Sequence, residues 1–99
     1  MNGHPEFKAI LDRLWELHCE KGDDYGSEAD PLLNIREAAD YGVPPWLAAL
    51  LRANDKVVRL KQFAKRRTLK NESVEDSILD LASYAILTLV LMREQPHDC

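Results

Sequence analysis

Residues 72–84 read Glu-Ser-Val-Glu-Asp-Ser-Ile-Leu-Asp-Leu-Ala-Ser-Tyr, and this stretch decides how the rest of the chain is interpreted. Three of its acids, Glu72, Asp76 and Asp80, are spaced four residues apart. In a helix, that spacing places them on one face. Apolar and aromatic side chains continue the same face toward the C-terminus: Tyr84, Leu87 and Leu91. A stripe of acids therefore runs into a stripe of expected core residues.

Such a stripe needs cationic partners, because acids at this spacing repel one another and a buried unpaired carboxylate costs roughly several kcal/mol. A hard divalent cation, Mg²⁺ or Mn²⁺, meets this need, since it takes oxygen ligands from carboxylates, water and phosphates. We therefore predict Glu72, Asp76 and Asp80 as metal ligands. For Glu72 and Asp76 the alternative is a first-turn position that suits the helix dipole. For Asp80 the alternative is a buried salt bridge to Arg59 or Arg52.

A basic segment precedes the acidic stripe. Between Leu51 and Lys70 a single acid, Asp55, stands among eight basic residues: Arg52, Lys56, Arg59, Lys61, Lys65, Arg66, Arg67 and Lys70. This pattern suits a polyphosphate held between cations and metal-bound carboxylates, and it equally suits an intramolecular salt-bridge network.

Asp55 is a further candidate metal ligand and catalytic acid, beside Asp76 and Asp80. If the third and fourth helices pack antiparallel, residues 52–59 face the acidic stripe. Arg52, Lys56 and Arg59 would then bind substrate phosphates through charged hydrogen bonds. The alternative for Asp55 is a solvated ion pair with Arg59 at the (i, i+4) spacing.

Helical periodicity is strong along the chain and strand signals are weak, so we predict an all-α bundle of about four helices. The expected helices cover about residues 5–20, 32–41, 45–66 and 73–94. Gly42 ends the second, and Ser73 with Asp76 resembles a capping box. Two glycines and a proline predict a loop over residues 21–31. In this loop Lys21 and Tyr25 are candidates to bind phosphate or stack on a base.

Ninety-nine residues predict a single domain over residues 1–99, with flexible ends at about 1–4 and 95–99. The last helix is apolar on almost every side, so we expect a homo-oligomer, a dimer or tetramer, that covers it. Two cysteines, Cys19 and Cys99, and no evident N-terminal signal favour the cytoplasm. No run is long and apolar enough for a membrane span. The net charge of −4 argues against nucleic acid as a partner.

These motifs, taken in order, resemble a known superfamily. The segments are Lys21-Gly-Asp-Asp-Tyr-Gly26, Asn34, Arg52-Ala-Asn-Asp-Lys-Val-Val-Arg-Leu60 and Glu72–Ala85. They look like small phage and prophage relatives of the all-α nucleoside triphosphate pyrophosphatases, the MazG-like superfamily. The resemblance covers about residues 7–92.

The resemblance implies an all-α oligomer that binds Mg²⁺ through carboxylates on two adjacent helices. It also implies hydrolysis of a nucleoside triphosphate to the monophosphate and pyrophosphate. Asp76 and Asp80 match the paired acids of the last helix. The chain departs from the larger enzymes on the preceding helix, where Asp55 stands in place of several glutamates. The alternatives are a nucleotide- or metal-binding accessory protein without catalysis, or an interaction module.

Overall fold

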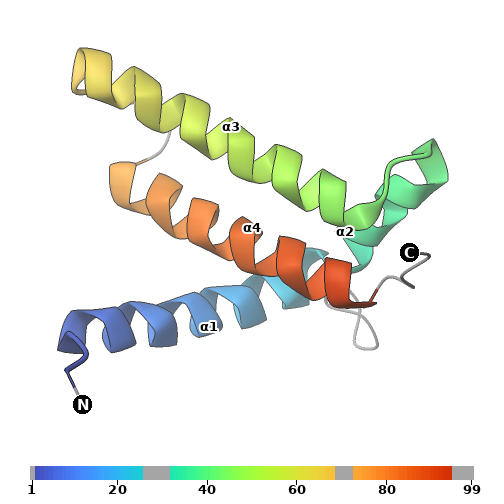
Figure 1. The fold of residues 1–99 in the computed structure, drawn as a ribbon, viewed down its shortest axis with the longest axis horizontal. Coiled ribbons are helices and arrows are strands. Elements are labelled where there is room, and N and C mark those ends of the chain that lie inside the picture. Colours follow the sequence, from blue (N-terminus) through green and yellow to red (C-terminus); the bar gives the residue numbers. More distant parts are fainter. Residues whose placement is uncertain (1, 26–31, 69–72, 95–99) are drawn as a thin grey trace. The chain divides into compact units, whose positions relative to one another are not determined.

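The protein is all-α, as predicted. The computed structural model describes residues 2–25, 32–68 and 73–94, and these ranges contain no strand. The elements in these ranges are α1 (Pro5–Tyr25), α2 (Leu33–Arg36), the 3₁₀ helix η1 (Glu37–Tyr41), α3 (Pro45–Arg66) and α4 (Val74–Glu94). Figure 1 labels the four α-helices α1 to α4.

The two long C-terminal helices begin and end where the sequence predicts. Pro45 occupies the first turn of α3, where its missing N–H removes no hydrogen bond. The Ser73 hydroxyl accepts a hydrogen bond from the backbone N–H of Asp76 at 3.0 Å, which is the N-terminal half of the predicted capping box. Local sequence signals are therefore sufficient to predict where both helices begin and end along the chain.

The prediction of a loop over residues 21–31 is wrong for the first five of these residues. Helix α1 continues through Gly22 and ends at Tyr25, so Lys21 and Asp24 are helical. A glycine costs a helix interior only about 1 kcal/mol, and extending an existing helix is easier than starting one. The remainder of that predicted loop, residues 26–31, lies outside the described residues.

The second predicted helix, over residues 32–41, is divided. One turn of α-helix, α2, leads directly into η1. Gly42 ends η1 in the left-handed conformation, with φ of 79°, and its N–H bonds to the carbonyl oxygen of Ala39 at 3.1 Å. The predicted stop at Gly42 is confirmed, because glycine adopts positive φ without a steric penalty.

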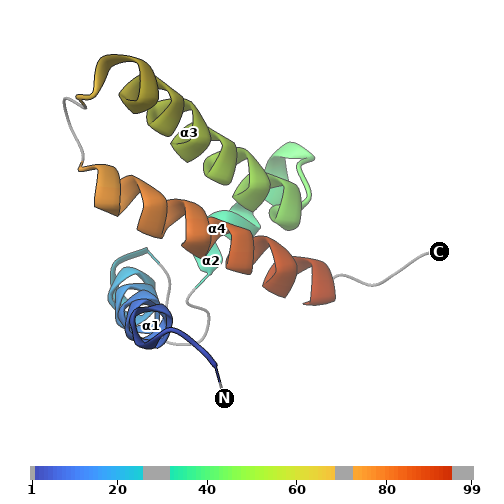
Figure 2. The same ribbon diagram turned by 60° about the vertical axis from the view of Figure 1, so that its left-hand side comes forward.

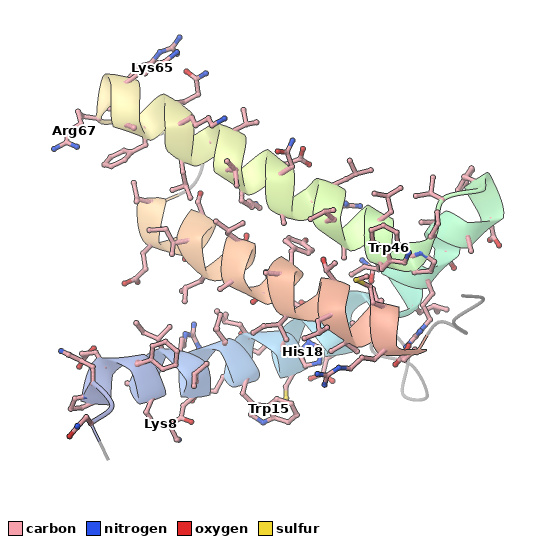
Figure 3. The ribbon with its side chains drawn as sticks, in the orientation of Figure 1. Lys8, Trp15, His18, Trp46, Lys65 and Arg67 are labelled. Carbon is pink, nitrogen blue, oxygen red and sulfur yellow. The ribbon has the colours of Figure 1, made fainter. Side chains whose placement is uncertain are left out.

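The chain forms two compact units, residues 1–34 and 35–99. In the first, α1 buries Leu14 but leaves Trp15 exposed, with the Trp15 and His18 rings 5.9 Å apart (Figure 3). In the second, α3 and α4 lie side by side and antiparallel, as Figures 1 and 2 show from two directions. Helix η1 contacts α3.

The contact between α3 and α4 has the spacing of a coiled-coil seam. On α3, the intervals alternate between three and four residues through six side chains that are buried or half-buried: Trp46, Ala49, Ala53, Lys56, Leu60 and Phe63. On α4, the most buried side chains are Ser77 and Leu91, at 0% and 3% exposed. This spacing keeps one stripe of each helix against its neighbour.

Substituting Gly42 with alanine tests the turn before α3. Gly42→Ala forces a Cβ into the left-handed conformation, so we expect a loss of about 1 kcal/mol in the free energy of unfolding, measured with urea. Gly3→Ala is the matched control, since Gly3 has open space around it and no positive φ. Equal stability of the two variants would contradict this account of the turn.

Candidate functional site

A charged pair lies between α3 and α4. The Lys56 Nζ and the Asp80 Oδ2 are 3.1 Å apart, and the two side chains are only 20% and 17% exposed. Lys56 occupies the middle of the α3 seam, and Asp80 is two turns into α4. A charge-assisted hydrogen bond therefore joins the two helices in a place where solvent is largely excluded.

The pair forms because both residues occupy seam positions. Lys56 follows Ala53 by three residues, and Asp80 follows the fully buried Ser77 by three residues. Each charged side chain therefore points to the facing helix rather than to water. Two alanines and a serine at the neighbouring seam positions leave space for the long lysine side chain to lie along the contact.

Arg59 and Ser77 extend the polar region toward the N-terminus of α4. Because the helices are antiparallel, the register that pairs Lys56 with Asp80 places Arg59 and Ser77 at the same level along the two helices, three residues onward in α3 and three residues back in α4. Arg59 is half-buried, and its Nε is buried without a hydrogen bond among the described residues, although the residue has other polar interactions. The site therefore holds two cations, a carboxylate and a hydroxyl.

The predicted acids do not all lie in this region. Asp76 is exposed in the first turn of α4, and Asp55 is exposed on α3, about 100° around the helix from Lys56. Glu72 lies outside the described residues. Among the residues that the structure describes, no three acidic, histidine or cysteine side chains are grouped closely enough to hold a metal ion. Asp80 is thus the one predicted acid in the described ranges that the fold brings into the seam.

The predicted substrate-binding residues are also divided. Lys56 lies in the seam and Arg59 is half-buried one turn away, whereas Arg52 is exposed. Lys21 is half-buried on α1 in the N-terminal unit, and the side chain of Tyr25 lies outside the described part of the chain. The candidate site therefore consists of Lys56, Arg59 and Asp80 from the predictions, together with Ser77.

Sequence reasoning missed two features of the site. Asp80 pairs with Lys56, whereas the sequence-based alternative for Asp80 is a salt bridge to Arg59 or Arg52, and Ser77 is not among the predicted site residues. The signal for both features is the spacing of the residues. The series Ala49, Ala53, Lys56 in α3 and the interval from Ser77 to Asp80 in α4 have the three-four pattern of a helix–helix contact.

Comparisons with known proteins do not place the chain in a family. No protein-family model matches it, and neither the curated proteins nor the solved structures contain a match.

A double-mutant cycle measures the coupling of Lys56 and Asp80. We expect Lys56→Met and Asp80→Asn each to lower the free energy of unfolding, because each leaves a polar group unmatched in the seam. Their coupling energy should be about 1–3 kcal/mol, measured by urea unfolding.

The matched control is the exposed pair of Lys8 and Asp12 on α1, with side chains 73% and 62% exposed. Its coupling energy should stay below about 0.5 kcal/mol, because solvent screens the charges. Equal coupling in the two pairs would show that the seam does not strengthen the interaction of Lys56 with Asp80.

Proposed function

We propose that the protein is a Mg²⁺-dependent nucleoside triphosphate pyrophosphohydrolase, which converts an NTP or dNTP to the monophosphate and pyrophosphate. The observation that supports this best is the half-buried carboxylate of Asp80 held 3.1 Å from the Lys56 amine across two antiparallel helices. Together with Arg59, this pair supplies an acid and two cations on adjacent helices, which are the groups that a metal–polyphosphate complex requires.

The charges at the adjoining ends of α3 and α4 favour the same ligand. The last turn of α3 carries Lys65 and Arg66, with Arg67 directly after it, and the first turn of α4 carries Glu75 and Asp76. Because the helices are antiparallel, these ends lie on the same side of the helix pair (Figure 1), and Figure 3 labels Lys65 and Arg67 there. Cations and carboxylates at one end suit phosphates and their bound metal respectively.

In this proposal Asp80 would hold the metal together with water and phosphate oxygens of the substrate, and the metal would polarise the phosphate chain and activate water. Lys56 has two tasks. Without substrate it neutralises Asp80, and with substrate it donates its hydrogen bonds to phosphate oxygens instead. Arg59, one turn away, offsets the charge of the leaving pyrophosphate. The protein would act where nucleotides are made and used, in the cytoplasm, that of a bacterial host if a phage encodes it.

Release of pyrophosphate tests the activity. Incubation with NTPs and dNTPs plus Mg²⁺ or Mn²⁺ should yield pyrophosphate, and Asp80→Asn should reduce the rate at least about 100-fold. The asparagine keeps the shape of the side chain, so helix content by circular dichroism should remain unchanged. Asp12→Asn is the matched control, since Asp12 is exposed on α1 and the chemical change is the same. If no nucleotide yields pyrophosphate, the enzymatic proposal is wrong.

A nucleotide-binding protein without catalysis is the second candidate. It is favoured by the Lys56–Asp80 ion pair, which gives Asp80 a structural partner, and by the exposed positions of Asp55 and Asp76.

No helix in the described ranges has both the length and the apolar character of a transmembrane segment.

Thermal unfolding separates the two candidates. A binding protein should gain thermal stability from nucleotide and Mg²⁺ together, by an amount that rises with ligand concentration, while releasing no pyrophosphate. Lys56→Met should remove this stabilisation, whereas Lys8→Met on α1 should preserve it. An unchanged unfolding temperature at millimolar nucleotide would argue against both candidates.

A further inference from the structure

The C-terminal end of α3 carries an exposed basic surface. Four basic residues are exposed there, Lys61, Lys65, Arg66 and Arg67, and residues 56–68 contain no acid. Lys61 and Lys65 lie one helical turn apart, about 6 Å along the axis. Lys65 points away from α4 in Figure 3, so it lies outside the seam between the two helices. We call these four residues the basic patch.

The patch lacks carboxylate partners among the described residues. Four other cations in the described ranges are paired: Lys8 with Asp12, Arg13 with Glu16, Arg36 with Glu94 and Lys56 with Asp80. By contrast, Lys61, Lys65 and Arg66 form no ion pair with any residue that the structure describes. Lys61 and Lys65, at the (i, i+4) spacing, repel each other and destabilise the helix end. An anion bound at the patch relieves that repulsion.

We propose that the basic patch binds the phosphate backbone of double-stranded DNA, independently of base sequence. A duplex carries one negative charge per about 1.7 Å of its length, and cations that neutralise its phosphates release condensed counterions. Lysine and arginine side chains are the usual donors to phosphate oxygens. From Lys61 to Arg67 the patch spans about 9 Å of chain along the helix axis, which allows about three phosphate contacts.

The side chains around the patch favour a duplex over other polyanions. Single strands bind where bases stack on open aromatic rings. The aromatic residue within this segment, Phe63, is half-buried, and the Arg67 guanidinium lies 5.7 Å from its ring centroid. Membrane surfaces bind helices that place large apolar residues beside the basic ones. From Lys61 to Thr68, no large apolar side chain is exposed. The patch therefore offers charge alone, which suits a duplex backbone.

The net charge of −4 does not prevent this binding. The expectation against nucleic acid rests on that sum, whereas salt at physiological concentration screens exposed charges beyond about 8 Å. A phosphate at the patch therefore meets the local field of α3, in which Asp55 is the single acid. Because the attraction is local and exposed, we expect it to be weak at physiological salt and to strengthen steeply as salt is removed.

Fluorescence anisotropy with a labelled DNA duplex of about 20 base pairs tests the binding, without nucleotide or Mg²⁺, so the result does not depend on the proposed activity. For three phosphate contacts, the Kd should rise about 40-fold between about 50 and about 200 mM salt. Lys61→Gln with Lys65→Gln should raise the Kd at least about 10-fold at the lower salt and reduce the salt slope by about 2.

The matched control is Lys8→Gln with Arg13→Gln, which removes the same charge from exposed positions on α1. It should bind within about twofold of the parent, and both double variants should keep the helix content of the parent. A parent that does not bind the duplex at the lower salt, or equal weakening in the two double variants, overturns the proposal. Tighter binding to the single strand, or binding to phosphatidylserine vesicles in place of the duplex, also overturns it.

An NMR titration of the full chain with the same duplex locates the contact. The backbone amide signals of residues 61–67 should shift most, because their side chains meet the phosphates. The amide signals of residues 5–20 on α1 should stay largely unchanged, since the cations Lys8 and Arg13 are already paired with carboxylates. The largest shifts outside residues 61–67 would place the contact elsewhere and overturn the proposal.

Discussion

The ion pair of Lys56 and Asp80 is the interaction on which the arrangement of α3 and α4 depends. A helix–helix contact made only of alanine, serine and leucine can slide by one turn at small cost, because one apolar residue replaces another. A lysine and an aspartate in the same seam remove that freedom. Sliding by one turn separates Lys56 from Asp80, and an unmatched charge in such a place costs several kcal/mol in rough terms.

The same pair links structure with the proposed chemistry. A carboxylate that is 17% exposed keeps enough access to meet a small ion, while the lysine beside it prevents the site from carrying an unpaired charge. If Lys56 moved from Asp80 to a phosphate while a metal ion bound Asp80, the lysine and the aspartate would each keep a partner of opposite charge. Lys56 therefore couples the stability of the helix pair to the proposed binding of nucleotide. A bound nucleotide must replace any hydrogen bond that its binding breaks between Lys56 and Asp80.

Helix α3 has two contrasting sides in the C-terminal unit. Its seam of small and charged residues lies against α4, while Leu50, Leu51 and Val58 remain exposed. Leucine and valine are more hydrophobic than alanine and lysine, so hydrophobicity alone would favour the side of Leu50, Leu51 and Val58 as the contact face. The structure shows that the neighbouring helix instead contacts the stripe of alanines, Lys56 and Leu60. Small residues permit a close approach, so the less hydrophobic stripe makes the intramolecular contact.

The sequence by itself determined the all-α class and the bounds of α3 and α4, because proline, serine and helical periodicity act locally. It also determined the stop at Gly42, where positive φ favours glycine. It could not determine the end of α1, since one glycine is a weak helix breaker. Only the tertiary structure decided that Asp80 meets Lys56 while Asp55 and Asp76 stay exposed. Pairing across two helices depends on their register, which residues distant in the sequence establish together.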